Sequence, residues 1–203
     1  MRLALFGATG RAGRVLLDQA LERGHQVTAL SRDPGAIPRH ERLRVVTGDV
    51  RDPVPVARAV EDAHAVVSTL GRRRRGPAIC TEGIRTILSA MADGRPRRLL
   101  VLSNYGVAES RHRGLYVAVS WLLQRPVLRD KEHMEALVRS SETAWTLVRA
   151  PVLTDGPRTG RYRAGPDLRL TFTSKVSRAD LAAFMVSELE DGAYLRQGVA
   201  VTS

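Results

Sequence analysis

Short runs of apolar residues alternate with segments of helical periodicity along the whole chain. The apolar runs are continuous rather than broken by a polar residue at every second position, which is typical of strands buried on both faces. They predict strands at residues 2–7, 26–30, 43–47, 65–70, 99–103, 145–148 and 198–202. The segments between them predict helices at residues 11–23, 54–62, 78–92, 113–124, 126–140 and 178–190, the last of them capped by Ser177.

This alternation of strands and helices predicts parallel strands that are joined by crossover helices. The expected fold is α/β, a doubly wound parallel sheet of the Rossmann type, in a single domain that covers residues 1–203. Residues 157–173 are rich in Gly, Pro, Thr and Arg and show weak periodicity. We expect the segment near residues 152–175 to pass over the substrate side of the sheet rather than to mark a domain boundary.

Three glycines stand where the first strand ends and the first helix begins. Gly7 permits a tight turn, Gly10 lets the backbone approach a pyrophosphate, and Gly13 allows the helix to pack closely on the strand. The helix N-terminus then offers free N–H groups and a positive dipole end to the phosphates. This loop predicts a dinucleotide site, and the alternative is a tight turn with no ligand. The candidate ligands from the loop are Gly7, Thr9, Gly10, Arg11, Ala12 and Gly13.

The residues after the second strand indicate which nicotinamide cofactor binds. An acidic residue there would bond the ribose 2′-hydroxyl and favour NAD, but the chain has Ser31 and Arg32 instead. Arg32 can pair with a 2′-phosphate and Ser31 can hydrogen-bond it, whereas Asp33 stands one position late. We therefore expect NADPH (NADP). The alternative is that Arg32 is one of many arginines on a solvated loop.

Composition and charge narrow the choice of function. The 203 residues include thirty arginines and two lysines, and the net charge is +11, which predicts affinity for nucleotides, acidic metabolites or nucleic acid. The chain shows no nucleic-acid-binding motif, so the nucleic-acid hypothesis rests on charge alone and is disfavoured. The expected partner is a small-molecule substrate, with an anionic one favoured by the charge.

Location and metal content are constrained by what the sequence lacks. No run of 18 apolar residues is present, so we expect no membrane-spanning helix, and the N-terminus lacks the layout of a signal peptide. Cys80 is the single cysteine, which excludes an internal disulfide and a cysteine-based metal site. The five histidines have no metal-ligand spacing, so no metal site is expected. These features predict a cytoplasmic protein.

The chain resembles the atypical short-chain dehydrogenase/reductases over essentially its whole length. It is most similar to the small NmrA-like NAD(P)H-binding proteins that include the biliverdin-IXβ/flavin reductases. The resemblance rests on the glycine loop and on Ser31-Arg32-Asp33, Gly48-Asp49, Leu70-Gly71, Ser103, Lys131, Glu135, Val148-Arg149-Ala150-Pro151 and Val176-Ser177-Arg178-Ala179-Asp180. It implies that Asp49 reaches the adenine with Val50 beside it, and that Leu70 and Gly71 lie under the cofactor.

Four arginines, residues 72–75, follow the fourth strand at the carboxyl edge of the sheet, where ligands bind. The resemblance implies that Arg73 helps to hold phosphate or substrate, and that Pro151 and Val152 contact the nicotinamide. The functional hypothesis for the arginine run is recruitment of cofactor phosphates or of an anionic substrate. The alternative is a solvated loop.

The catalytic pattern departs from that of many relatives, which use Tyr-x-x-x-Lys with a serine at the end of the fifth strand. The lysine lowers the pKa of the tyrosine so that it can pass a proton at neutral pH. Alignment on Lys131 places Val127 at the tyrosine position. Tyr116 has a suitable spacing from Ser103, but Ser120 stands where its lysine should be. No catalytic tyrosine is therefore assigned.

Ser103 and Lys131 remain the candidate catalytic residues. Ser103 can hydrogen-bond a substrate oxygen or the nicotinamide; the alternative is a strand-end serine whose hydrogen bonds are satisfied within the protein. Lys131 can bond the nicotinamide ribose; the alternative is a solvated helix lysine. The sequence favours an NADPH-dependent reductase that passes hydride to a small planar conjugated acceptor, of flavin, quinone or tetrapyrrole type. The alternative is a non-catalytic NADP(H)-binding redox sensor. The sequence does not indicate the oligomeric state.

Overall fold

The computed structural model describes residues 1–72, 76–92, 94, 96–111 and 114–203. Within this part of the chain, an eight-stranded sheet has the order β3-β2-β1-β4-β5-β6-β10-β8. Its strands are β1 (Arg2–Phe6), β2 (Gln26–Ser31), β3 (Leu43–Thr47), β4 (Ala65–Ser68), β5 (Arg98–Asn104), β6 (Ala144–Ala150), β8 (Arg163–Gly165) and β10 (Gln197–Thr202). Neighbouring strands are parallel, except that β8 runs antiparallel to β10. The predicted α/β doubly wound parallel sheet is confirmed.

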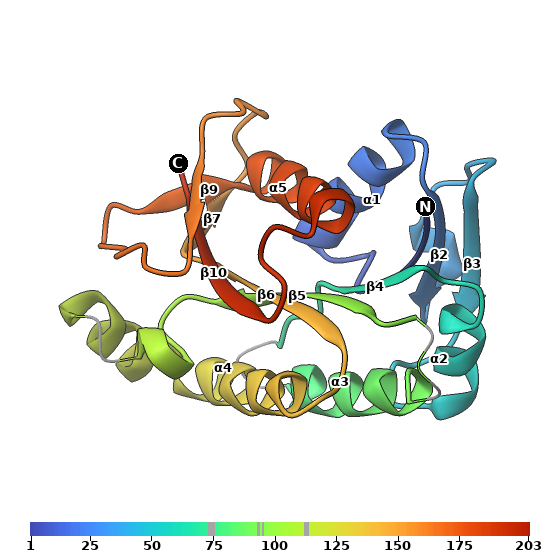
Figure 1. Ribbon diagram of the computed structural model, residues 1–203, viewed down its shortest axis with the longest axis horizontal. Helices are drawn as coiled ribbons and strands as arrows, with labels where there is room; N and C mark the ends of the chain where they lie inside the picture. Colours follow the sequence, from blue (N-terminus) through green and yellow to red (C-terminus); the bar gives the residue numbers. More distant parts are fainter. Residues whose placement is uncertain (73–75, 93, 95, 112–113) are drawn as a thin grey trace.

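Helices cover both faces of this sheet (Figure 1). The helices α1 (Arg11–Glu22) and α5 (Arg178–Asp191) lie side by side on one face. The other face is covered by α2 (Pro53–Val60), α3 (Ile79–Ala90) and α4 (Leu115–Arg139). Four of the six predicted helices have bounds within two residues of the prediction, and the other two are joined in α4.

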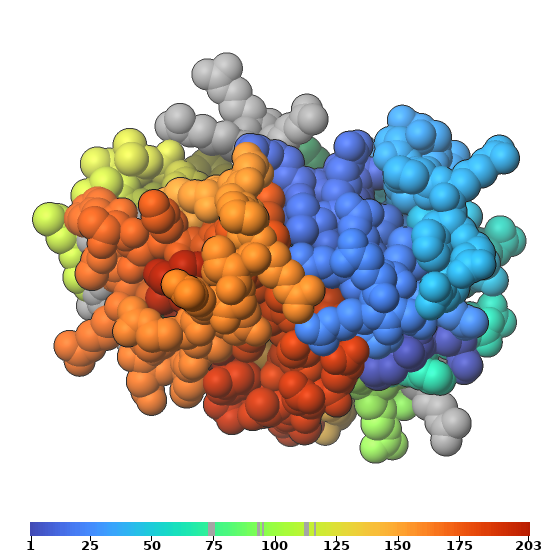
Figure 2. Space-filling view, turned by 90° about the horizontal axis from the view of Figure 1, so that it is seen from above, coloured from blue at the N-terminus to red at the C-terminus, as the bar shows by residue number. Residues whose placement is uncertain are grey.

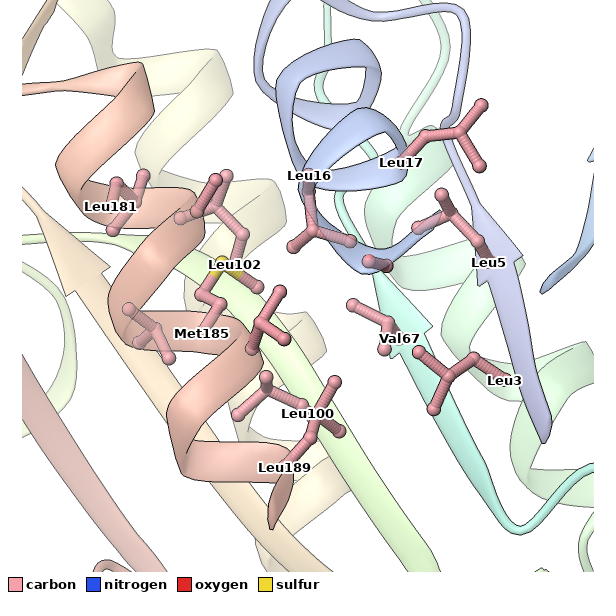
Figure 3. Packing of buried hydrophobic residues seen from close by; sticks show 14 of the residues in the cluster. Leu3, Leu5, Leu16, Leu17, Val67, Leu100, Leu102, Leu181, Met185 and Leu189 are labelled. Atoms are coloured by element: carbon pink, nitrogen blue, oxygen red, sulfur yellow. The ribbon is translucent and has the colours of Figure 1, made fainter. Parts of the chain in front are cut away.

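Aliphatic side chains of alternate strand residues form the core on each face. Leu3, Leu5, Val67 and Leu100 point toward α1 and α5, where they meet leucines of both helices (Figure 3). Neighbouring residues such as Val66 face α2, α3 and α4 instead. Burial of each large aliphatic side chain stabilises the fold by roughly 1.5–3 kcal/mol. This packing fixes the strand register, and with it the edge at which the loops meet.

The helix α4 covers two segments that the sequence predicts as separate helices. Its backbone is continuous, but Gln124 has φ −126° and ψ 23°, which are not helical angles. The kink lies two residues before Pro126. A proline ring displaces the preceding turn and removes a backbone donor, so the predicted break appears as a bend.

The segment after β6 leaves the main sheet. It is bracketed by β7 (Val152–Thr154) and β9 (Lys175–Ser177), which pair in parallel as a separate two-stranded sheet. The sequence analysis did not predict β8, which lies inside the segment and extends the main sheet beside β10. A strand of three residues that includes a glycine is too short for its pattern to be recognised.

A buried carboxylate on α5 anchors this segment. Asp180 accepts hydrogen bonds of 2.8 Å from the backbone N–H groups of Thr159 and Gly160, and one of 2.8 Å from the Thr159 hydroxyl. The Ser177 hydroxyl also contacts it at 3.0 Å and caps α5, as predicted. Burial alone would raise the pKa of Asp180, but these hydrogen bonds outweigh it and hold the pKa below its ordinary value. The ionised form therefore holds the loop.

The anchor predicts a pH-dependent loss of stability in Asp180→Asn. At pH 7 the variant should be less stable to urea by roughly 1–3 kcal/mol, because an amide cannot accept all of these hydrogen bonds. A depressed pKa in the folded protein gives stability that is present above the unfolded-state pKa and is lost as the pH falls. The deficit should therefore shrink below about pH 4. A deficit that is constant with pH would show that ionisation of Asp180 does not matter.

Candidate functional site

The order of the strands reverses between β1 and β4. From this point β2 and β3 extend the sheet in one direction, and β5 and β6 extend it in the other. Ligands of open α/β sheets bind at such a switch point, beyond the carboxyl ends of the strands. The loops that follow β1 and β4 meet there, so the glycine loop lies where a ligand is expected.

Close packing requires two of the three loop glycines. Gly7 has a φ of +91°, and a Cβ on it would lie 2.8 Å from the Thr69 Oγ1. A Cβ on Gly13 would lie only 2.1 Å from the Gly7 carbonyl oxygen. The Thr69 hydroxyl donates to the carbonyl oxygens of Phe6 and Gly7, at 3.1 and 3.2 Å, and so ties the turn to the end of β4.

Gly10 differs from the other two glycines of the loop, Gly7 and Gly13. Its φ of −73° suits any residue, and a Cβ would lie 3.2 Å from the Gly7 carbonyl oxygen as its one close contact. It is the N-cap of α1, where no side chain caps the helix and no acidic residue occupies the first turn. Side chains do cap α2 and α5, through Asp52 and Ser177. The N-terminus of α1 thus keeps its N–H groups and its positive dipole end for an anion.

An ionised carboxylate, that of Asp49, follows β3. Asp49 accepts hydrogen bonds from the Arg51 guanidinium at 2.9 Å on each oxygen, and from the Arg51 backbone N–H at 2.9 Å. These bonds, led by the side-chain bond, lower the pKa of Asp49 to about 2, and the positive charge of Arg32 contributes. Asp49 is therefore an acceptor at neutral pH, which suits the amino group of an adenine.

Arg32 is exposed directly after β2. Ser31 is buried, and its hydroxyl donates to the Asp33 carbonyl at 2.7 Å and accepts from the Asp33 N–H at 3.1 Å. Asp33 in turn caps a short 3-10 helix, Pro34–Ala36. Ser31 therefore shapes the turn that presents Arg32.

Apolar side chains that follow β3 and β4 pack against α3. Val50 and Leu70 pack over Gly83 of α3, where a Cβ would lie 2.6 Å from the Leu70 Cδ1 and 3.0 Å from the Val50 Cγ1. Gly71 is exposed, and a Cβ on it would meet nothing within 4 Å. These residues, with the uncapped α1, fit a dinucleotide that runs along the carboxyl edge of the sheet.

Lys131 is buried rather than solvated, so the alternative given for it is wrong. Its ammonium donates to the carbonyl oxygens of Leu70 at 2.8 Å and Leu102 at 2.7 Å. These residues follow β4 and belong to β5, so the lysine ties two neighbouring strand ends together. The Leu70 carbonyl is turned toward this ammonium, and β4 ends at Ser68, two residues earlier than predicted. A bond from Lys131 to the nicotinamide ribose stays a prediction.

Asp130, the neighbour of Lys131, closes the N-terminus of α3. Its carboxylate accepts from the backbone N–H groups of Cys80 and Thr81, at 3.1 and 2.9 Å, and from the Thr81 hydroxyl at 2.6 Å. Burial raises the pKa of the Cys80 thiol, which keeps it protonated. The N-terminus of α3 is therefore already occupied by a carboxylate, in contrast to α1.

The Ser103 hydroxyl is buried and has no hydrogen-bond partner among the described residues. The alternative of a satisfied strand-end serine is therefore wrong for the part of the chain that the structure describes. The Ser68 hydroxyl, on the neighbouring strand β4, is in the same state. Tyr105 follows closely, but its hydroxyl accepts the Leu170 N–H at 3.3 Å in a separate buried cluster.

The remaining candidates from the sequence are Pro151, Val152 and the arginine run after β4. Pro151 is buried, and Val152 is exposed at the start of β7. Arg72 donates to the carbonyl oxygens of Gly76 and Pro126, at 3.0 and 3.1 Å. Arg73, Arg74 and Arg75 lie outside the described residues.

Sequence reasoning missed the residues whose partners are distant in the chain. Thr69 supports the glycine loop across 62 residues, and Asp130 caps a helix 49 residues away. Asp155 pairs with both Arg11 and Arg178. No local pattern marks such residues, because the fold alone creates their contacts.

Across the described residues, no group of three or more His, Cys, Asp or Glu side chains is placed to hold a metal ion. The helices in the described part of the chain are all too short or too polar to cross a membrane.

Known proteins with this architecture include reductases. YwnB, an uncharacterized Bacillus subtilis protein, is 27% identical over 213 residues, which cover 100% of this chain and 99% of YwnB. ChuY, an anaerobilin reductase from Escherichia coli O157:H7, superposes with a TM-score of 0.87 at 23% identity, over 99% of this chain and 96% of ChuY. A Veillonella parvula short-chain dehydrogenase/reductase in complex with NADP gives 0.82 at 20% identity, over 100% and 94%.

The structural likenesses show the fold, and the glycine loop agrees with a nucleotide site at the switch point. The family is shown by the sequence itself, because a family model described as NAD(P)H-binding matches residues 7–192. The resemblance identified from the motifs is confirmed, and the chain belongs to the NAD(P)H-binding family.

Proposed function

We propose that this protein is an NADPH-dependent reductase that transfers hydride to a small, planar, conjugated acceptor. The bound NADPH supplies the hydride. The glycine loop and the bare α1 N-terminus hold its pyrophosphate, Arg32 holds its 2′-phosphate, and Asp49 accepts from its adenine. The reductase activity of ChuY, a protein of the same fold, supports the reaction class.

The observation that carries the choice of acceptor is the missing acid. Val127 stands where a catalytic tyrosine would precede Lys131, and the lysine ammonium is engaged by two backbone carbonyls. Hydride transfer to an ordinary ketone generates an alkoxide, a strong base that needs a nearby acid. Ser103 is too weak an acid to supply that proton alone.

A conjugated acceptor removes this requirement. The negative charge spreads over the conjugated system, and water can protonate the product. The protein then needs to hold donor and acceptor face to face, an orientation effect worth several kcal/mol. Ser103 would orient the acceptor or the nicotinamide through its hydroxyl, which has no partner in the described part of the chain. A redox sensor that binds NADP(H) without turnover is the second candidate, and the same missing tyrosine favours it.

The position of Arg32 predicts that NADPH binds more tightly than NADH. A charge-assisted contact to the 2′-phosphate contributes roughly 1.5–3 kcal/mol, about ten- to a hundredfold in affinity. Arg32→Ala should narrow this gap, mainly by weakening NADPH, as measured by fluorescence titration. Arg39→Ala is the control, since it removes an exposed arginine from the same connection between β2 and β3. Equal affinities of the unmodified protein for NADPH and NADH would refute the assignment.

The missing acid predicts a clear division among acceptors. With NADPH, the protein should reduce quinones, flavins or linear tetrapyrroles and show little or no activity on aliphatic ketones and aldehydes, as followed by absorbance of the reduced cofactor. Ser103→Ala should slow the reaction only modestly, because the hydroxyl orients rather than donates a proton. Tight NADPH binding with no turnover of any acceptor would select the sensor. Efficient oxidation of a secondary alcohol would mean that Tyr116 or another acid reaches the site.

A further inference from the structure

Two arginines from different helices meet at a single carboxylate beside the glycine loop. Arg11 is the first residue of α1, and Arg178 is the first residue of α5. The Arg11 Nη2 contacts the Asp155 Oδ2, and the Arg178 Nη1 lies 2.5 Å from the Asp155 Oδ1. The segment after β7 lies against α1 on the surface of the molecule (Figure 2). A carboxylate thus stands close to the helix end that is bare of caps.

The fold holds Asp155 in this place. It directly follows β7, whose Thr154 is in register with Ser177 of β9, so residue 155 is brought beside residue 178. The anchor around Asp180 pins the chain a few residues further on. Asp155 therefore reaches the two arginines from a segment that is held by β7 on one side and by the Asp180 hydrogen bonds on the other.

The two arginines differ in their freedom to leave Asp155. The Arg11 side chain is 71% exposed, and that of Arg178 is 12% exposed. An exposed ion pair contributes little to stability, so Arg11 can exchange its partner at little cost. Arg178 is held by its burial and keeps Asp155 neutralised when Arg11 moves away.

We propose that Asp155 is an internal competitor for the cofactor pyrophosphate, and that Arg11 exchanges Asp155 for the pyrophosphate when NADPH binds. This inference rests on the proposed function, because it takes the glycine loop to be the dinucleotide site. The negative charge of Asp155 opposes the approach of the phosphates and occupies a guanidinium that would otherwise be ready for them. Arg178 limits this opposition by pairing with the carboxylate. The exchange also breaks the Arg11–Asp155 ion pair, which joins the segment after β7 to α1. Cofactor binding therefore frees from α1 the segment that we expect on the substrate side.

The test is a titration of NADP⁺ into the unmodified protein and four variants at low ionic strength. Asp155→Asn should bind roughly three- to tenfold more tightly than the unmodified protein, and the gain should shrink as salt is added. Asp167→Asn is the matched control: it removes the same charge from an exposed position in the same segment and should leave the affinity within about twofold. Thermal melts of each variant establish that it is folded.

Arg178→Gln separates the two roles that Arg178 could have. The variant should bind NADP⁺ more weakly, because Asp155 then keeps its full charge and its hold on Arg11. The double variant Arg178→Gln/Asp155→Asn should regain the affinity of Asp155→Asn. A double variant as weak as Arg178→Gln would mean that Arg178 touches the phosphate itself, which would overturn its role as a neutralising partner.

The failures of the inference and of the proposed function can be told apart. If Asp155→Asn binds no more tightly than Asp167→Asn while the unmodified protein binds NADP⁺, the inference alone is overturned. If neither the unmodified protein nor any variant binds a nicotinamide dinucleotide, the proposed function is overturned, and the inference with it.

Discussion

The site depends on the contact between the first turn of α1 and the glycine turn after β1. A Cβ on Gly13 would lie 2.1 Å from the Gly7 carbonyl oxygen, so helix and strand approach more closely than any other residue would allow. The Thr69 hydroxyl joins this turn to the end of β4. The approach sets the bare end of α1 over the point where the strand order reverses. The backbone N–H groups and the positive dipole at that helix end suit a phosphate.

Beneath this edge, a buried polar cluster fixes the ends of the strands. Lys131 bonds carbonyl oxygens at the ends of β4 and β5, and Asp130 closes the N-terminus of α3. Each group is placed where an unpaired backbone atom would otherwise be buried at a cost. Lys131, which stands where many relatives carry the lysine of the Tyr-x-x-x-Lys pattern, thus bonds two backbone carbonyls here. The chain keeps the scaffold of the short-chain reductases, and the described residues leave the proton donor unassigned.

The sequence predicted the features that arise from local pattern. Continuous apolar runs marked the strands, and the glycine spacing marked the first turn, because each depends on residues adjacent in the chain. It could not predict β8, which exists only because β10 offers an edge to pair with. It also left open whether Lys131 is solvated, since burial is decided by how α4 packs against β5. The Asp155 contacts were missed for the same reason, because they join positions that are 144 and 23 residues apart.

The most direct test of the account is the effect of Gly10→Val on nucleotide binding and on stability together. Gly10 has ordinary backbone angles, so the variant should keep a cooperative thermal transition, while its side chain should obstruct the pyrophosphate and weaken NADPH binding at least tenfold. Gly165→Val, in β8 at the end of the sheet, where a Cβ would make an ordinary 3.6 Å contact with Leu168, should bind as the unmodified protein does. A folded Gly10→Val that binds NADPH with full affinity would contradict the account, because the pyrophosphate could not then lie against the end of α1.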